Sequence, residues 1–291
     1  MSRLSRWLRS RREKPARPLP NAPPTPYDHL LYVPRFEECV ETLLEQPFRL
    51  ADGSSFYASY REIFLGELYR FPSANPAPRI VDCGANCGVS VVYFKQLFPA
   101  AKIIAVEADP AIFALLEWNV SHRELRDVTL INKAVAVGTQ PVTFHREGAD
   151  AGRIHTLADT KEHITVPVVS LDELLCEPVD MLKIDIEGAE TDVLCKSERL
   201  HNVAQLMVEY HSFGDAPQAL HELLSALASN GFRYYVQSQF CPARPLVDHS
   251  SHLGMDLQLN IFGKRAEQIA TLQDDTPRCG APNQTASPQA A

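Results

Sequence analysis

From Arg79 onward, short apolar runs alternate with longer segments whose apolar residues recur at helical spacing. Runs of about four to eight apolar residues predict buried strands, and a period of about 3.6 predicts helices with one apolar face. The predicted strands cover residues 79–82, 102–107, 128–135, 180–185 and 205–210. The predicted helices cover residues 89–98, 110–119, 189–198 and 217–229. This alternation predicts a doubly wound, mostly parallel α/β sheet with helices on both faces.

Further apolar runs complete the predicted sheet. Residues 142–145 and 166–170 predict additional short strands where a helix would often stand. Residues 233–239 and 256–263 predict two closing strands, and the segment between them contains no clear helical pattern. Neighbouring strands without a crossover helix pair in antiparallel fashion, so we expect an antiparallel C-terminal edge strand.

The composition divides the chain into four parts. They are a basic, Pro-rich arm, a small N-terminal cap, the α/β domain and a polar tail, at residues 1–26, 27–78, 79–265 and 266–291. The arm and the tail are expected to be disordered, because they lack a pattern that could bury apolar surface. In the cap, we expect a β-hairpin over 48–58, with its turn at 51–53, and a helix over 62–69.

The basic arm admits two further interpretations. Its first 17 residues hold seven basic side chains and one acidic side chain. Leu4, Trp7 and Leu8 would share one face of a short helix, which could rest on an anionic membrane surface. A transit peptide has the same Arg-rich, acid-poor composition. We therefore expect a disordered tail, with peripheral membrane contact and targeting as the alternatives.

Charge and cysteine content narrow the class of protein. The whole chain carries a net charge of −8 despite its basic arm, so its body is strongly acidic and disfavours nucleic acid as a partner. The seven cysteines include no Cys-x-x-Cys pair, which favours free thiols in a reducing compartment. No apolar run is long enough to span a bilayer. We expect a soluble, cytoplasmic protein.

The first strand of the α/β domain leads into a glycine-containing turn, Asp82-Cys83-Gly84-Ala85-Asn86-Cys87-Gly88. Ligands of open α/β sheets bind at the carboxyl ends of the strands, where such turns lie. Gly84 allows a sharp turn, and Asp82 could hold the ammonium group of S-adenosylmethionine (SAM) directly or through water. A dinucleotide motif would have Gly-x-Gly-x-x-Gly spacing and would not place an acid in front of a diphosphate.

The second strand ends in Glu107, which lies 25 residues after Asp82. A carboxylate at this place can accept two hydrogen bonds from a ribose diol, so Glu107 indicates a nucleoside ligand. A polar residue near the third strand commonly meets an adenine edge, although the residue is not identified. The expected SAM contacts are Asp82, Gly84, Asn86, Gly88, Glu107, Ala108, Asp127 and Ala134.

The fourth strand supplies the most distinctive sequence, Leu182-Lys183-Ile184-Asp185-Ile186-Glu187-Gly188-Ala189-Glu190. With Val81–Gly88, Val106–Pro110, Asn132–Val135 and Val169–Leu174, it strongly resembles the FkbM-type methyltransferase family over residues 79–211. The resemblance implies a class I methyltransferase (Rossmann-like) fold, SAM as cofactor and O-methylation of a sugar or natural-product hydroxyl. Ala108 departs from the proline that many members carry, and Cys83 and Cys87 replace apolar residues.

Methyl transfer to a hydroxyl requires a positioned acceptor oxygen and a group that removes its proton. The catalytic candidates at the ends of the fourth and fifth strands are Lys183, Asp185, Glu209 and His211. We expect Asp185 or His211 to act as general base and Glu209 to orient the acceptor. Two alternatives stay open: Lys183 and Asp185 form a structural pair, or Asp185, Glu187 and Glu209 hold a divalent cation. No metal is assigned.

Three functions compete at this stage. The first is methylation of a small-molecule or glycan hydroxyl. The second is a nicotinamide-dependent oxidoreductase, disfavoured by the missing third glycine. The third is a non-catalytic SAM-binding protein. We expect the acceptor to contact residues 27–75, 146–166 and 240–255, whose sequences do not identify it. The oligomeric state is equally unspecified.

Overall fold

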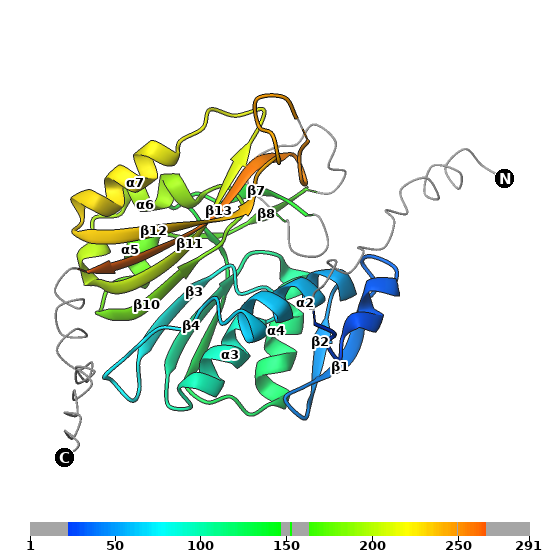
Figure 1. Cartoon of the computed structure of the whole chain (residues 1–291). Coiled ribbons are helices and arrows are strands. Elements are labelled where there is room, and N and C mark those ends of the chain that lie inside the picture. The colour runs from blue at the N-terminus through cyan, green and yellow to red at the C-terminus, as the bar shows by residue number, and fades with distance from the viewer. Residues whose placement is uncertain (1–22, 147–151, 153–162, 249, 266–291) are drawn as a thin grey trace, which may run out of the picture.

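A seven-stranded sheet organises the computed structural model, which describes residues 23–146, 152, 163–248 and 250–265 (Figure 1). The strand order is β12-β13-β11-β10-β3-β4-β5. These strands are β12 (Phe232–Phe240), β13 (Met255–Arg265), β11 (Val203–Phe213), β10 (Val179–Ile184), β3 (Arg79–Cys83), β4 (Lys102–Glu107) and β5 (Val128–Asn132). The strand order reverses between β3 and β10, which is where ligands bind in doubly wound sheets.

The predicted fold class is confirmed. All five predicted parallel strands are present, and β13 runs antiparallel to both of its neighbours, β11 and β12. This C-terminal strand lies one position inside the edge, because β12 takes the outermost place. No helix in the described part of the chain is long and apolar enough to cross a membrane.

Two layers of helices cover the sheet (Figure 1). One face carries α3 (Val89–Leu97) and α4 (Pro110–His122), and the other carries α6 (Glu190–Lys196) and α7 (Leu220–Ser229). Side chains alternate across the strands, so Ile80 of β3 packs into the first layer and Val81 into the second. The helix α4 begins where the sequence predicts, because Pro110 occupies its first turn and the Asp109 carboxylate accepts a hydrogen bond from the Ala111 amide.

The cap contains a hairpin, but one strand earlier than predicted. It consists of β1 (Cys39–Leu43) and β2 (Gln46–Leu50), and the expected second strand is instead the helix α2 (Gly53–Tyr60). Asp52 explains the error: its carboxylate accepts a hydrogen bond from the Ser55 amide and starts a helix where the sequence also permits a turn. The helix predicted over 62–69 is the π-helix η2 (Arg61–Leu65), which ends four residues early.

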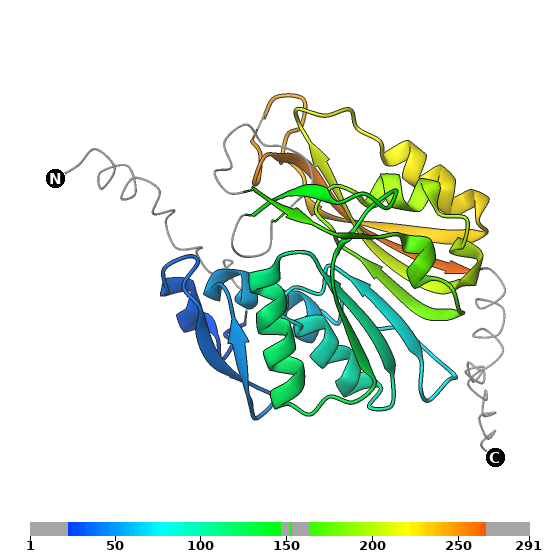
Figure 2. The same ribbon diagram turned by 180° about the vertical axis from the view of Figure 1, so that it is seen from behind.

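The cap shares one hydrophobic core with the α/β domain and lies beside α4 (Figure 2). Asn119 of α4 joins the two parts. Its side chain accepts a hydrogen bond from the Arg49 amide and donates to the Arg49 and Cys87 carbonyl oxygens, at 2.7, 2.8 and 2.8 Å. Asn119 is buried, so these bonds fix strand β2 against the loop that follows β3.

The additional strands form two small pairings. The strand β7 (Val142–His145) pairs antiparallel with β8 (His163–Val166), and β6 (Ala134–Val135) pairs parallel with β9 (Val168–Val169). The predicted third strand is therefore divided into β5 and β6. Most of the basic arm, up to residue 22, and the whole tail from residue 266 lie outside the described residues, so their predicted disorder and membrane contact stay predictions.

Candidate active site

A single cavity contains both ends of the predicted site, at the carboxyl ends of the parallel strands. The loop after β3 and the end of β4 form one side, with Asn86 and Glu107 in its lining. The ends of β10 and β11 form the other side, with Asp185 and Glu209. The two motifs are about a hundred residues apart in sequence. The sheet brings them to one opening, because neighbouring parallel strands have their carboxyl ends side by side.

The loop between β3 and α3 contains three residues with left-handed backbone: Gly84 (φ 83°), Asn86 (φ 49°) and Gly88 (φ 94°). A Cβ at Gly84 would lie 1.7 Å from the carbonyl oxygen of Asp185, so this glycine lets the ends of β3 and β10 touch. A Cβ at Gly88 would lie 2.7 Å from Leu116 of α4. Gly84 lines the cavity, whereas Gly88 serves helix packing.

Glu107 faces the cavity from the end of β4 and is nearly buried. Its two carboxylate oxygens accept hydrogen bonds from the backbone amides of Asn86 at 3.0 Å and Asp109 at 2.8 Å. Burial raises the pKa of Glu107 to about 7, although these two amides oppose the shift. The carboxylate is thereby held in place with lone pairs left for a diol.

Asp82 lies behind the cavity and does not line it. It is fully buried, its Oδ2 accepts a hydrogen bond from the Ser90 hydroxyl at 2.5 Å, and its Oδ1 lies 3.4 Å from Lys183 Nζ. Ser90 and Lys183 do line the cavity. The carboxylate therefore supports two residues that face a ligand.

The remaining predicted cofactor residues fall into two groups. Ala108 and Ala134 line the cavity. Asp127 precedes β5 at the amino ends of the strands, where its carbonyl oxygen accepts a bond from the Ile103 amide, and it does not line the cavity. This position contradicts its predicted contact with the cofactor. The error arises because Asp127 stands at the amino end of the strand, while ligands bind beyond the carboxyl end. Lys133 lines the cavity there instead.

Lys183 is the buried cation of the site. Its Nζ donates a hydrogen bond to the Gly84 carbonyl oxygen at 2.6 Å and lies 3.4 Å from both Asp82 and Asp185. Burial alone would lower the pKa of Lys183, but the carboxylates of Asp185 and Asp82 outweigh it and raise that pKa well above its usual value. The structural pairing of Lys183 and Asp185 considered from sequence is therefore present, and both residues also line the cavity.

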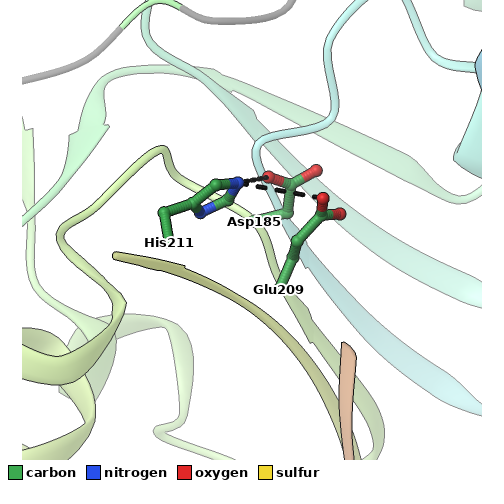
Figure 3. Close-up of side chains that lie close together, drawn as sticks. All are labelled: Asp185, Glu209 and His211. Atoms are coloured by element: carbon green, nitrogen blue, oxygen red, sulfur yellow. Dashed lines mark ion pairs between the residues drawn. The ribbon is translucent and has the colours of Figure 1, made fainter. Parts of the chain in front are cut away.

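Asp185, Glu209 and His211 converge at the ends of β10 and β11 (Figure 3). His211 Nε2 lies 4.0 Å from Asp185 Oδ1 and 3.8 Å from Glu209 Oε1, and Glu187 Oε2 is 3.7 Å away. The Gln258 side-chain amide donates a hydrogen bond to Glu209. Burial and the charge of Asp185 raise the pKa of Glu209 to about 8. The structure thus gathers the four predicted catalytic residues into one region.

Glu190 was not among the predicted site residues, although it holds His211 from behind. The buried Glu190 carboxylate lies 2.9 Å from His211 Nδ1 and accepts hydrogen bonds from the backbone amides of Ile186 and Gly188. Burial would lower the pKa of His211, but Glu187 and Glu190 raise it well above its usual value. His211 is completely buried and does not line the cavity.

Comparison with known proteins identifies the family. Residues 82–234 match the sequence profile of the methyltransferase FkbM domain, which is more than half of the chain. The chain belongs to the FkbM methyltransferase family. This membership overturns the nicotinamide alternative. The cofactor is SAM. The cavity fits it, because a carboxylate (Glu107), an ammonium group (Lys183) and the glycine turn at Gly84 all line it.

Individual relatives of this FkbM methyltransferase are distant. Methyltransferase sdnD of Sordaria araneosa is 29% identical over 188 residues, covering 50% of this chain and 73% of its own. The 31-O-demethyl-FK506 methyltransferase FkbM of Streptomyces tacrolimicus is 26% identical over 211 residues, covering 60% and 80%. The crystal structure of M. jannaschii TYW2 in complex with AdoMet has a TM-score of 0.45 and 15% identity, over 78% of this chain and 84% of that one.

Proposed function

We propose that this FkbM methyltransferase methylates a hydroxyl group of a sugar, a glycan or a small natural product. One observation carries the proposal: a single cavity joins the nucleoside-binding end, with Glu107, to a carboxylate cluster formed by Asp185, Glu187 and Glu209. The name of the relative that acts on 31-O-demethyl-FK506 supports an oxygen acceptor.

The cofactor contacts follow from the positions of the lining residues. Glu107 accepts hydrogen bonds from the ribose diol, while Ala108 and Ala134 pack against the adenine. Lys183 and the backbone at Gly84 and Asn86 hold the methionine part. Asp82 supports this end by fixing Ser90 and Lys183 rather than by contacting the ligand itself.

The protein must supply orientation and a path for one proton. SAM carries a methyl group on a cationic sulfur, and its transfer to a hydroxyl oxygen leaves a neutral thioether and releases the hydroxyl proton. Asp185 is the carboxylate placed to accept that proton, because its side chain is 24% exposed and lines the cavity. His211 is fully buried behind Asp185, so it positions the cluster. Glu209 orients the acceptor together with Gln258.

The acceptor end of the cavity is polar and acidic. Glu62 of the cap accepts a hydrogen bond from the side chain of Gln239, and these two residues line the cavity together with His252. Carboxylate and amide groups offer acceptors and donors to several hydroxyls at once. The surrounding negative charge disfavours phosphorylated or carboxylated acceptors. These features favour a neutral, polyhydroxylated acceptor.

Labelled methyl transfer tests the proposal. Purified protein is incubated with methyl-labelled SAM and a panel of glycans and hydroxylated natural products, and products are analysed for a methoxy carbon by NMR. We expect an O-methyl product with the wild type. Asp185→Asn should bind SAM normally while turnover falls at least about 100-fold, as expected for loss of a proton acceptor. Products methylated on nitrogen or carbon, or full activity of the variant, would contradict the assignment.

A further inference from the structure

Three side chains at the ends of β10 and β11 are arranged like the ligands of a metal ion. One carboxylate oxygen of Asp185, one of Glu209 and a ring nitrogen of His211 all lie within 4.8 Å of one another (Figure 3). They come from neighbouring strands, because Asp185 follows β10 and the other two belong to β11. A cation between them would need only small side-chain movements to reach coordination distances of about 2.0–2.2 Å.

The orientation of His211 supports this arrangement independently of the acidic residues. Its Nδ1 faces the Glu190 carboxylate at 2.9 Å, so Nε2 is directed into the cluster. Among the described residues, the carboxylate oxygen nearest to Nε2 lies 3.7 Å away, which is too far for a hydrogen bond. The side-chain nitrogen of Gln258 is closer, at 3.5 Å, and it is a hydrogen-bond donor. A fully buried imidazole with one nitrogen held by a carboxylate and the other facing three further carboxylates is the usual environment of a metal-binding histidine.

The charge of the region also favours a cation. Asp185, Glu187, Glu190 and Glu209 surround His211, whereas Lys183 is the one lysine paired with this set among the described residues. Carboxylates held this close together repel one another. A divalent cation between them removes this repulsion, which favours binding of the cation.

We propose that Asp185, Glu209 and His211 bind a divalent first-row transition-metal cation, with Glu190 as the residue that orients His211. One imidazole and two carboxylates suit Mn²⁺, Fe²⁺ or Zn²⁺ better than Ca²⁺ or Mg²⁺, which prefer oxygen ligands alone. Three protein ligands leave coordination positions open toward the cavity, which Asp185 and Glu209 both line.

The role of the cation rests on the proposed function, although its binding does not. The cation would bind the acceptor hydroxyl oxygen and lower the pKa of that hydroxyl. The O–H proton then passes to the Asp185 carboxylate oxygen that does not bind the cation, the oxygen electron pair forms the bond to the methyl carbon, and the sulfur keeps the electrons of the broken S–C bond. Asp185 would contribute as a ligand that places the acceptor beside the methyl group.

Metal binding can be measured without any acceptor. Full-length protein is stripped with a chelator and titrated with Mn²⁺ alone, and free Mn²⁺ is followed by electron paramagnetic resonance. We expect one Mn²⁺ per chain, and at least a tenfold weaker affinity in each of Asp185→Asn, Glu209→Gln and His211→Asn. Glu107→Gln is the matched control, because it removes a buried carboxylate from the other side of the same cavity and should bind Mn²⁺ normally.

SAM binding by calorimetry shows which of the three ligand variants are folded, and those variants decide the result. The site assignment is overturned if the wild type binds no Mn²⁺, or if every folded ligand variant binds it as the wild type does. Methyl transfer by metal-free protein with unchanged turnover would reject the role of the cation and leave the proposed function intact. Mn²⁺ binding without methyl transfer to any hydroxyl would reject the proposed function and leave the site intact.

Discussion

The Glu190 carboxylate lies 2.9 Å from Nδ1 of His211, and both side chains are almost completely buried. Glu190 also accepts hydrogen bonds from the amides of Ile186 and Gly188, so one side chain fixes both the imidazole and the loop after β10. The shape of the carboxylate cluster therefore depends on a residue that does not line the cavity.

Removing Glu190 should destabilise the protein strongly. Glu190→Ala leaves a buried imidazole and two amides without an acceptor, and we expect a loss of about 3–5 kcal/mol in the free energy of unfolding. Glu190→Gln retains an acceptor and should cost less. Urea denaturation measures both. Glu177→Ala is the control, because this exposed carboxylate pairs with Arg79 at the surface and should cost at most about 1 kcal/mol. Equal losses for Glu190→Ala and Glu177→Ala would show that Glu190 is not a structural centre of the site.

Glu107 should make SAM binding depend on pH. Its pKa is raised to about 7, and the ribose diol needs the ionised carboxylate as acceptor, so affinity should fall by up to about tenfold per pH unit below 7. Glu107→Gln should bind SAM about 10–100-fold more weakly above pH 7, with little change between pH 6 and 8. Calorimetry at several pH values measures this. A wild-type affinity that is constant from pH 5.5 to 8 would contradict the role of Glu107.

The same substitution should stabilise the free protein. The pKa of Glu107 is higher in the folded state than in the unfolded chain, so the folded state binds more protons between about pH 4.5 and 7. Stability due to this group therefore falls as pH rises through that window. The melting temperature of Glu107→Gln should exceed that of the wild type at pH 8 and approach it near pH 4.5. A variant that is less stable than the wild type at pH 8 would show that the hydrogen bonds from the Asn86 and Asp109 amides stabilise the protein by more than burial of the charged carboxylate costs.

Two glycines with similar backbone angles distinguish the cost of a left-handed backbone from the cost of a steric clash of the added Cβ. Gly84 (φ 83°) and Gly138 (φ 90°) both have left-handed backbone, but a Cβ would lie 1.7 Å from the Asp185 carbonyl oxygen at the first and would meet no atom within 4 Å at the second. Gly138→Ala should cost about 1–2 kcal/mol. Gly84→Ala should cost more than about 4 kcal/mol or prevent folding. Similar melting temperatures for the two variants would disprove the close approach of β3 and β10.

Lys183 should matter more to stability than another buried lysine. Lys183→Met leaves Asp82 and Asp185 without their cation, and we expect a loss of about 3–5 kcal/mol. Lys95→Met removes only a hydrogen bond to the Ala101 carbonyl oxygen among the described contacts and should cost about 1 kcal/mol. Asp82→Asn added to Lys183→Met should recover part of the loss. A double variant that is no more stable than Lys183→Met would show that Asp82 and Lys183 are not coupled.

The sequence predicted those parts of the fold that local pattern determines. Strand and helix periodicity located the sheet, and the strand ends located Glu107 and Asp185, because parallel strands bring their carboxyl ends to one edge. The cap hairpin was misplaced, since Asp52 and Gly53 suit a turn as well as a helix start. Asp127 was assigned to the cofactor although the predicted strand 128–135 already placed it at the amino end, whereas ligands bind beyond the carboxyl ends.

Long-range contacts account for what the sequence could not show. Asn119 joins Arg49 and Cys87, which are 70 and 32 residues away, and no local pattern marks a buried asparagine with three partners. The role of Glu190 was hidden for a related reason: an acid at a helix start complements the helix on its own, and only the arrangement of β10 and β11 brings His211 to it.

The central claim is that one cavity holds SAM with its ribose on Glu107 and its sulfur toward Asp185. A crystal structure with bound S-adenosylhomocysteine tests this most directly. The account predicts both ribose hydroxyls within hydrogen-bonding distance of the Glu107 carboxylate and a sulfur atom that faces Asp185 and Glu209 across the cavity. A ribose bound away from Glu107, or a sulfur directed away from the ends of β10 and β11, would contradict it.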